Sequence, residues 1–252
     1  MSSEDENETA HFFFSLLFFQ VPVLTAQTYY VDNNHPSAND SNPATEALPW
    51  KTIQKAANTL VAGDTVYIKQ GTYTGTVSPK NSGSAGAFIT YSAYPGHEHQ
   101  VILDGAAFRI IKKSYIIASG LRVQNVLQGT SGGSIGIRIE GPGSNIIVSG
   151  NYTFNTGSSG IAAWGVPYGK DPTIYDYKAI TNLIIENNKI EKACNGGYNE
   201  AITVANGVDN FEIKGNLVFN GVEQPNGGEG IDVKNGASNG KIYQNEVRNL
   251  YK

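Results

Sequence analysis

The sequence predicts an all-β chain wound into a parallel β-helix, in which stacked coils form three sheets around one core. Five short stretches share one pattern and start 30, 37, 28 and 29 residues apart, at 121–125, 151–155, 188–192, 216–220 and 245–249. Six residues before each stretch stands a marker that a short apolar run usually follows: Tyr115, Asn145, Asn182, Asn210 or Asn239. The composition agrees, since 29 Gly, 14 Tyr and 16% charged residues suit strands joined by tight corners. A repeat of this length indicates a unit that buries its apolar face only by stacking on its neighbours.

The first predicted elements are a strand at 29–32, a polar loop at 33–49 and one amphipathic helix. Apolar residues follow Pro49 at helical spacing and predict about three turns: Trp50, Ile53, Ala56, Ala57 and Leu60. An open β-helix end exposes unpaired backbone and apolar interior, so we expect this helix to cap the N-terminal end. Segment 63–73 then begins the first coil, and 88–94 with 101–103 supply the second.

Three sets of side chains are expected to point inward, because residues alternate between the two faces of a strand. After each marker they are Ile146/Val148, Leu183/Ile185, Phe211/Ile213 and Ile242. In the next strand they are Val123, Thr153, Ile190, Val218 and Val247. The third set is Ile137/Ile139, Ile161/Ala163, Ile202/Val204 and Ile231/Val233. Asparagines repeated at the corners are expected to stack as a hydrogen-bonded ladder, since Asn tolerates the left-handed conformation of such corners.

Charge and targeting signals narrow the class of protein. The formal charge of −4 becomes zero without the four acids before residue 27, so no nucleic-acid or membrane-surface partner is indicated. The single Cys194 excludes a disulfide framework. The apolar run 11–26 is too short for a comfortable membrane span and ends near a small residue, as secretory signals do, although the acidic start has the wrong sign. We therefore expect a signal-like segment at 1–27, a β-helix domain at 28–252, and a secreted or cell-surface monomer.

The segment PWKTIQKAANTLVAGDTVYIKQGTY (49–73) resembles the N-terminal cap and first coil of the secreted, right-handed β-helix proteins of the pectate-lyase-like superfamily. The resemblance extends over about residues 28–252. It implies a right-handed, single-stranded parallel β-helix of three sheets with an N-terminal capping helix. The superfamily includes lyases, hydrolases, epimerases and non-catalytic adhesion modules, so the reaction has to be argued from the site residues.

Aligning two coils places segment 199–207 over segment 228–236. Glu200 would then lie beside Glu229, about 4.8 Å away along the ladder, with Asp232 and Lys234 projecting outward. Two stacked carboxylates are unfavourable unless a cation or a proton lies between them, and hard oxygen ligands suit Ca²⁺. The sequence therefore predicts a calcium site at Glu200, Glu229 and Asp232.

This site suits β-elimination on the uronic acids of an acidic polysaccharide. A bound cation would neutralise the sugar carboxylate, and Lys234 would remove the neighbouring proton, its pKa lowered by the cation and by partial burial. The stretch Glu229–Lys234 resembles the motif of β-helix lyases that cut alginate and chondroitin-type chains. In that motif Glu229 matches the nearer acid, Gly227 stands in place of the farther one, and an essential arginine belongs to the following coil, beyond Lys252. The chain stops mid-coil after Leu250, so we expect a fragment of a longer protein.

The spacing of 37 residues contains an insertion at 165–177 beside Trp164. Trp164 falls in the same outward column as Lys234, two coils earlier, if Ile161 rather than Ile174 heads its strand. Aromatic side chains beside a groove hold sugar rings against their apolar faces. The predicted substrate-binding residues are Trp164, Tyr168, Tyr175, Tyr177 and Arg138.

Three other interpretations stay open at this point. The outward acids and Lys234 can be a solvated face whose ion pairs contribute little stability. A glycoside hydrolase would use Asp232 with Glu229 or Glu200 as its two carboxylates. The third is a non-catalytic carbohydrate-binding or surface module.

Overall fold

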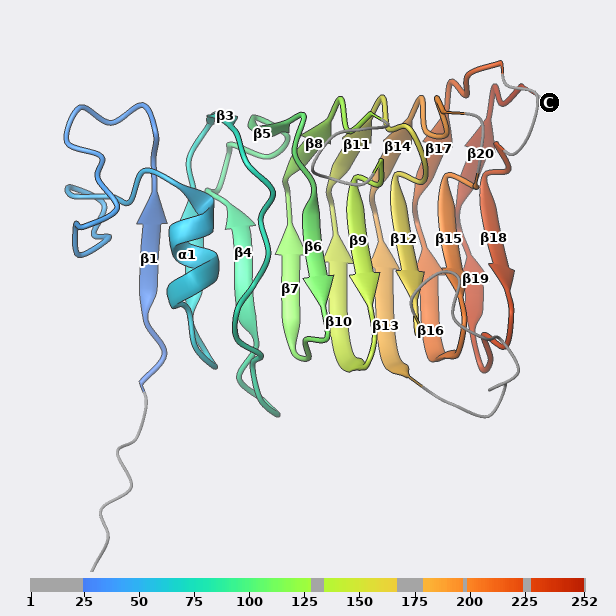
Figure 1. The fold of residues 1–252 in the computed structure, drawn as a ribbon, viewed down its shortest axis with the longest axis horizontal. Helices are drawn as coiled ribbons and strands as arrows, with labels where there is room; N and C mark the ends of the chain where they lie inside the picture. The colour runs from blue at the N-terminus through green and yellow to red at the C-terminus, as the bar shows by residue number, and fades with distance from the viewer. Residues whose placement is uncertain (1–24, 128–133, 167–178, 197–198, 224–227, 252) are drawn as a thin grey trace, which may run out of the picture.

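The protein is a parallel β-helix in which three sheets enclose one apolar core (Figure 1). The computed structural model describes residues 25–127, 134–166, 179–196, 199–223 and 228–251. The strands of each sheet pair in parallel from one coil to the next, and the coils advance along a single axis. The all-β class and the three-sheet architecture predicted from the sequence are confirmed.

Sheet A extends along the whole column. Its eight strands follow in the order β1 (Thr28–Val31), β2 (Thr65–Ile68), β4 (Ile89–Ala93), β7 (Ile116–Ser119), β10 (Gly143–Ser149), β13 (Ile180–Glu186), β16 (Val208–Lys214) and β19 (Lys241–Tyr243).

Sheet B has seven short strands and sheet C has five. Sheet B contains β3 (Gly71–Tyr73), β5 (Val101–Asp104), β8 (Arg122–Gln124), β11 (Tyr152–Phe154), β14 (Lys189–Glu191), β17 (Leu217–Phe219) and β20 (Glu246–Arg248). Sheet C contains β6 (Phe108–Ile111), β9 (Ile137–Glu140), β12 (Ile161–Trp164), β15 (Ile202–Ala205) and β18 (Ile231–Lys234).

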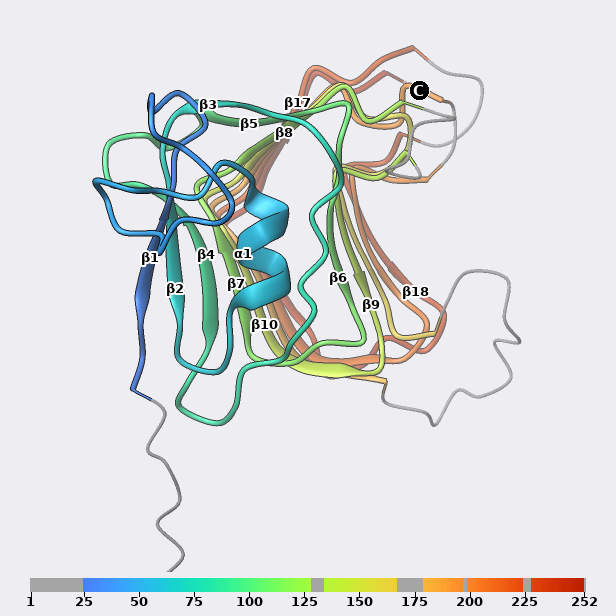
Figure 2. The same cartoon turned by 60° about the vertical axis from the view of Figure 1, so that its left-hand side comes forward.

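Helix α1 (Ile53–Thr59) lies across the N-terminal opening of the column, as predicted (Figure 2). It buries Ile53, Ala56 and Ala57 in the core. The prediction of about three turns from residue 50 is wrong, because the helix has seven residues. Thr52 is its N-cap and accepts a hydrogen bond from the amide of Lys55, which fixes the start at Ile53, three residues after Trp50. Trp50 instead bridges to Val31 and stacks on Tyr29, with ring centroids 4.9 Å apart.

The predicted inward residues form the core of the middle coils. Those of sheet C are fully buried from β9 to β15: Ile137, Ile139, Ile161, Ala163, Ile202 and Val204. Burying a side chain of this size contributes roughly 1.5–3 kcal/mol, and the contribution is repeated on every coil. In the last coil the inward side chains are open, with Ile242 52% and Val247 46% exposed.

A buried asparagine ladder holds the corner between sheets A and B. Asn151 donates from Nδ2 to Oδ1 of Asn188, Asn188 does the same to Asn216, and Asn216 to Asn245, at 2.9–3.1 Å. Each of these three also donates to a backbone carbonyl, that of Ala118, Val148 or Ile185. The ladder predicted from the repeat is confirmed, and it satisfies polar groups that burial would otherwise leave without partners.

In the part of the chain that the structure describes, no helical segment has the length and apolarity that a bilayer crossing requires. The predicted signal-like segment falls largely outside the described residues, which begin at residue 25.

Candidate functional site

The candidate site lies on the outward face of sheet C, where the pairing of β12, β15 and β18 fixes which side chains are neighbours. Ile202 pairs with Ile231 and Val204 with Val233, so the register predicted for these coils is confirmed. One outward column is Trp164, Ala205 and Lys234, and the other is Ala162, Thr203 and Asp232. Ile161, not Ile174, begins β12, which settles the column of Trp164.

An ion cluster centred on Lys234 forms at the C-terminal end of this face. The Nζ atom lies 2.5 Å from Oε1 of Glu200 and 3.0 Å from Oδ2 of Asp232. Glu200 is buried, with a side-chain exposure of 10%, whereas Lys234 and Asp232 are about one third exposed. Two carboxylates from adjacent coils therefore converge on one ammonium group that reaches the surface.

Two buried hydroxyl groups support the carboxylate of Glu200 on the side away from Lys234. Its Oε2 accepts a hydrogen bond of 2.9 Å from Thr203, whose hydroxyl lies 3.0 Å from that of Ser159. Thr203 and Ser159 are both buried. The prediction that Glu200 lies on the solvent side next to Glu229 is wrong for Glu200, because the neighbouring ammonium and hydroxyl groups allow its carboxylate to be buried. Glu229, on the next coil, is exposed.

The pKa of Lys234 is raised above its ordinary value. Burial lowers this pKa, and the contacts with Glu200 and Asp232 together raise it by more. Without a further cation nearby, Lys234 is therefore an ammonium group at neutral pH, which differs from the lowered pKa expected from the sequence.

The predicted calcium ligands do not fit a metal ion in this arrangement. Carboxylate oxygens suit Ca²⁺ chemically, but the ammonium of Lys234 occupies the position between Glu200 and Asp232. Among the described residues, no three His, Cys, Asp or Glu side chains lie close enough to hold one metal ion together.

The predicted sugar platform is covered. Trp164 points away from the core, yet it is only 6% exposed and packs with Ile135, Ala162 and Ala205 in a small cluster outside the column. Tyr168, Tyr175 and Tyr177 lie outside the described residues. The middle of the outward face of sheet C is therefore covered, and Trp164 offers little open surface to a sugar ring.

Arg138 lies on the other side of this covered centre. Its guanidinium stacks over the Trp164 ring, 5.5 Å from the centroid, and forms an ion pair with Glu140. Arg109 on β6 pairs with Arg138 in the register of sheet C, and burial together with the charge of Arg138 lowers the pKa of Arg109, partly offset by Glu140. The structure therefore separates Arg138 from Lys234 by the Trp164 cluster.

Four residues of this face were not predicted from the sequence: Glu140, Arg109, Thr203 and Ser159. Glu140 and Arg109 could have been found, because counting outward columns from β12 back to β6 places them beside Trp164 and Arg138. No sequence signal distinguishes Thr203 and Ser159 from the other threonines and serines of the chain. Cys194 is buried, and burial raises its pKa to about 12, which makes its thiol unreactive.

The family model for the Pel9A-like, right-handed β-helix region matches residues 29–207. The chain belongs to this family. It is 30% identical over 209 residues to the uncharacterized protein YwoF of Bacillus subtilis, covering 79% of this chain and 42% of that protein. It is 36% identical over 94 residues to pectate lyase PEL9 of Emericella nidulans, covering 36% of this chain and 21% of that protein. The chain thus spans less than half the length of these curated relatives.

Solved structures of the same fold include polysaccharide-active proteins. A rhamnogalacturonan lyase aligns with a TM-score of 0.65 at 20% identity, covering 87% of this chain and 58% of the other. Pectate lyase Pel9A aligns with a TM-score of 0.56 at 15% identity, covering 88% and 63%. At these identities the likeness shows the right-handed β-helix fold, and the activity has to be argued from the site.

Proposed function

We propose that this chain is part of a secreted lyase that cleaves an acidic, pectate-type polysaccharide by β-elimination. The observation that carries the proposal is the ammonium of Lys234, held at the surface of sheet C by Glu200 and Asp232. The family supports the reaction class, and relatives named pectate lyase support the substrate class. The apolar run at 11–26 supports secretion.

Lys234 is the proposed base. In β-elimination the base takes the proton on the carbon next to the uronate carboxylate. The released electron pair forms a carbon–carbon double bond, the bond to the glycosidic oxygen breaks, and that oxygen takes up a proton. Because Glu200 and Asp232 favour the charged form of Lys234, the neutral base is populated only in alkaline solution. Glu200 positions Lys234 and does not itself touch the substrate, since its carboxylate is buried.

Arg138 is the proposed contact for a substrate carboxylate away from the bond that breaks. Its guanidinium already pairs with one carboxylate, that of Glu140, and a planar guanidinium binds carboxylates through two parallel hydrogen bonds. We also propose that Ca²⁺ competes with Lys234 for the same carboxylates. Glu200, Glu229 and Asp232 would bind the ion only if the ammonium of Lys234 moved away from them.

The test is to mix the protein with polygalacturonate, alginate or chondroitin and record the ultraviolet absorbance of an unsaturated uronate product. We expect the absorbance to rise with polygalacturonate and the rise to be lost in Lys234→Ala. If polygalacturonate is bound and none of the three polymers yields the unsaturated product, the lyase proposal is wrong.

A glycoside hydrolase is the second candidate, and one observation favours it. Glu200 and Asp232 both contact the same nitrogen, so two carboxylates lie close together, as in retaining hydrolases, whose pair is about 5–5.5 Å apart; this candidate requires the buried Glu200 to become accessible to the substrate. New reducing ends without an unsaturated product would support this candidate. Binding without either product would support a non-catalytic module.

A further inference from the structure

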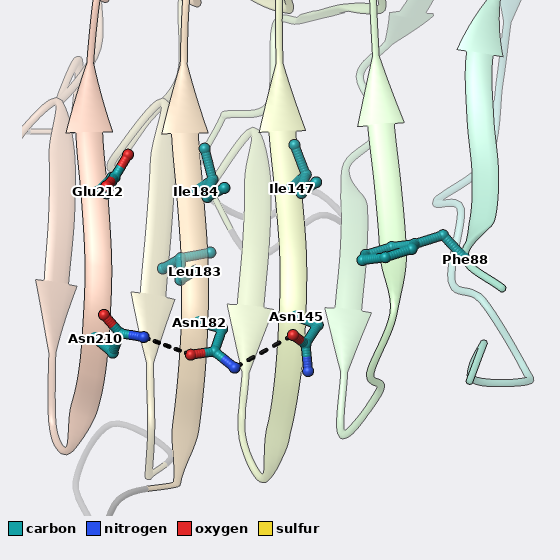
Figure 3. Close-up of a pocket in the computed structure, with 8 residues that line it drawn as sticks. All are labelled: Phe88, Asn145, Ile147, Asn182, Leu183, Ile184, Asn210 and Glu212. Carbon is teal, nitrogen blue, oxygen red and sulfur yellow. Dashed lines mark hydrogen bonds between the residues drawn. The ribbon is translucent and has the colours of Figure 1, made fainter. Parts of the chain in front are cut away.

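A second, separate groove lies on the outward face of sheet A (Figure 3). It has a volume of about 180 Å³ and is lined by Phe88, Asn145, Ile147, Asn182, Leu183, Ile184, Asn210 and Glu212. All of these residues are described, and none belongs to the candidate site on sheet C. Closed pockets for small ligands are typically about 300–1,000 Å³, so this groove fits a segment of a longer chain better than a whole small molecule.

The groove is built from repeated rungs. Ile147 on β10 pairs with Ile184 on β13, which pairs with Glu212 on β16, so these three side chains form one outward row. A parallel row of Asn145, Asn182 and Asn210 lies at the start of the same strands (Figure 3). Both rows repeat at the strand spacing of about 4.8 Å. A linear polymer whose units repeat on a comparable length can meet the same pair of groups on each strand.

The asparagine row keeps free hydrogen-bonding capacity. Asn182 donates from Nδ2 to Oδ1 of Asn145 at 3.2 Å and accepts from Nδ2 of Asn210 at 2.5 Å. A side-chain amide has two N–H donors and an oxygen with two lone pairs, so this use leaves one donor and one acceptor on Asn182. Asn182 and Asn210 are exposed, unlike the buried ladder at the neighbouring corner. Adjacent donors and acceptors of this kind match the hydroxyl groups of a sugar.

An aromatic ring closes the N-terminal end of the groove. Phe88 is half-buried and held edge-on by Tyr115, with ring centroids 5.5 Å apart and an interplanar angle of 75°. Figure 3 shows Phe88 at the end of the groove opposite Glu212. Phe88 directly precedes Ile89, which aligns with Ile116 and Ile146, so Phe88 continues the asparagine row. The ring and the two isoleucines therefore offer apolar surface for the C–H faces of sugar rings, next to amides that serve their hydroxyls.

The charge of the groove favours an uncharged ligand. Glu212 is the one ionisable residue of the lining, and its Oε2 accepts hydrogen bonds from Lys214 at 2.9 Å and from Tyr243 at 3.1 Å. These two contacts lower the pKa of Glu212, so its carboxylate is ionised at neutral pH. Lys214 and Lys241 form ion pairs with this carboxylate, so the lining offers no unpaired positive charge to attract a polyuronate, while the carboxylate can accept hydrogen bonds from sugar hydroxyls.

We propose that this groove binds a neutral glycan chain that lies across the strands of sheet A, parallel to the axis of the column. The site holds uncharged polysaccharide, or an uncharged branch of a larger one, and is independent of the chemistry on sheet C.

The test is native gel electrophoresis of the full chain in gels that contain galactan, arabinan or xylan, with polygalacturonate as the charged comparison. We expect at least one neutral polymer to slow the protein. Phe88→Ala should weaken this binding by roughly tenfold, through loss of ring stacking. Ile184→Thr should weaken it by a few-fold, because Thr keeps the branched shape but loses apolar surface.

Ile102→Thr is the matched control, because Ile102 on β5 is an outward, half-buried isoleucine of sheet B and lies away from the groove. It should bind neutral polymer like the unchanged protein, as should Lys234→Ala. Circular dichroism and thermal melting establish that each variant is folded. The proposal is overturned if no neutral polymer slows the protein, if Ile102→Thr binds as weakly as Ile184→Thr, or if light scattering shows that the groove joins two copies of the chain.

Discussion

The outward faces of sheets A and C are carried by the same kind of parallel ladder and differ only in their side chains. Sheet C presents an ion cluster in which Lys234 contacts two carboxylates, and sheet A presents rows of asparagine and isoleucine with one paired carboxylate. In both sheets the inward residues of the middle coils are apolar and buried. The inward half of each strand thus determines the fold, and the outward half is free to carry separate functions.

The two faces also differ in how far their side chains are covered. On sheet C, Trp164 and Ala205 are nearly inaccessible, whereas Lys234 at one end of the face and Arg138 at the other reach the surface. On sheet A, Ile147 and Ile184 remain half-buried and line an open groove. Four experiments test this contrast, and they follow in order of decreasing expected effect.

Lys234→Ala should lower the rate of uronate elimination by about 100-fold or more, because removing a general base costs roughly 10²–10⁴ in rate. The measurement is the initial rate of unsaturated product formation from polygalacturonate. Lys241→Ala is the control, since Lys241 is an exposed lysine on sheet A. If the rate of Lys234→Ala is within twofold of that of the unchanged protein, Lys234 is not the base.

Asn188→Ala should lower the free energy of unfolding by about 2–4 kcal/mol. The side chain of Asn188 bonds Asn151, Asn216 and the carbonyl of Val148, and each buried polar group left without a partner costs roughly 1–3 kcal/mol.

The matched variant for that experiment is Asn182→Gly, in the exposed row of the groove. Gly keeps the left-handed backbone of Asn182, whose φ is 58°, so we expect a loss below about 1 kcal/mol. Urea unfolding measures both variants. Equal losses would contradict the distinction between the buried and the exposed ladder.

Glu200→Gln should shift the pH profile of elimination toward lower pH. Glu200 raises the pKa of Lys234, so without this charge the neutral base forms at a less alkaline pH. The stabilisation from the raised pKa is present below the ordinary lysine pKa and is lost as the pH rises through the folded-state value. The pH dependence of kcat/KM measures the shift. Glu212→Gln, which removes one of the two carboxylate partners of Lys214 on sheet A, should leave the profile unchanged.

Lys234→Met should increase the affinity for Ca²⁺, because it frees the carboxylates of Glu200 and Asp232 from their ammonium partner. Isothermal titration calorimetry of the unchanged protein, Lys234→Met and Lys241→Met measures the effect. If all three titrations are alike, these carboxylates do not form a calcium site with or without Lys234.

Much of the fold could be predicted because the repeat makes one local pattern recur on every coil. The spacing of the asparagines placed the buried ladder, and the alternation around Ile202 and Ile231 gave the register of sheet C. The length of α1 was predicted less well. Trp50 fits the helical spacing, but it stacks on Tyr29, and Thr52 caps the helix, so the helix begins only at Ile53. The candidate site was predicted as a set of neighbours, but the exposure of its members was not. Whether Glu200 and Trp164 are open or covered depends on groups that lie far away in the sequence.

The amino-acid sequence alone determined that the chain stacks as a β-helix and which residues fall in each outward column, because hydrophobic alternation and corner residues act locally and repeat. Only the tertiary structure decided that Lys234 pairs with Glu200 of the adjacent coil and that Trp164 is covered. It also decided that Asn182, Ile184 and Phe88 line one groove. These contacts join residues separated by tens of positions. Their geometry follows from strand spacing, side-chain rotamers and burial, which no local pattern encodes.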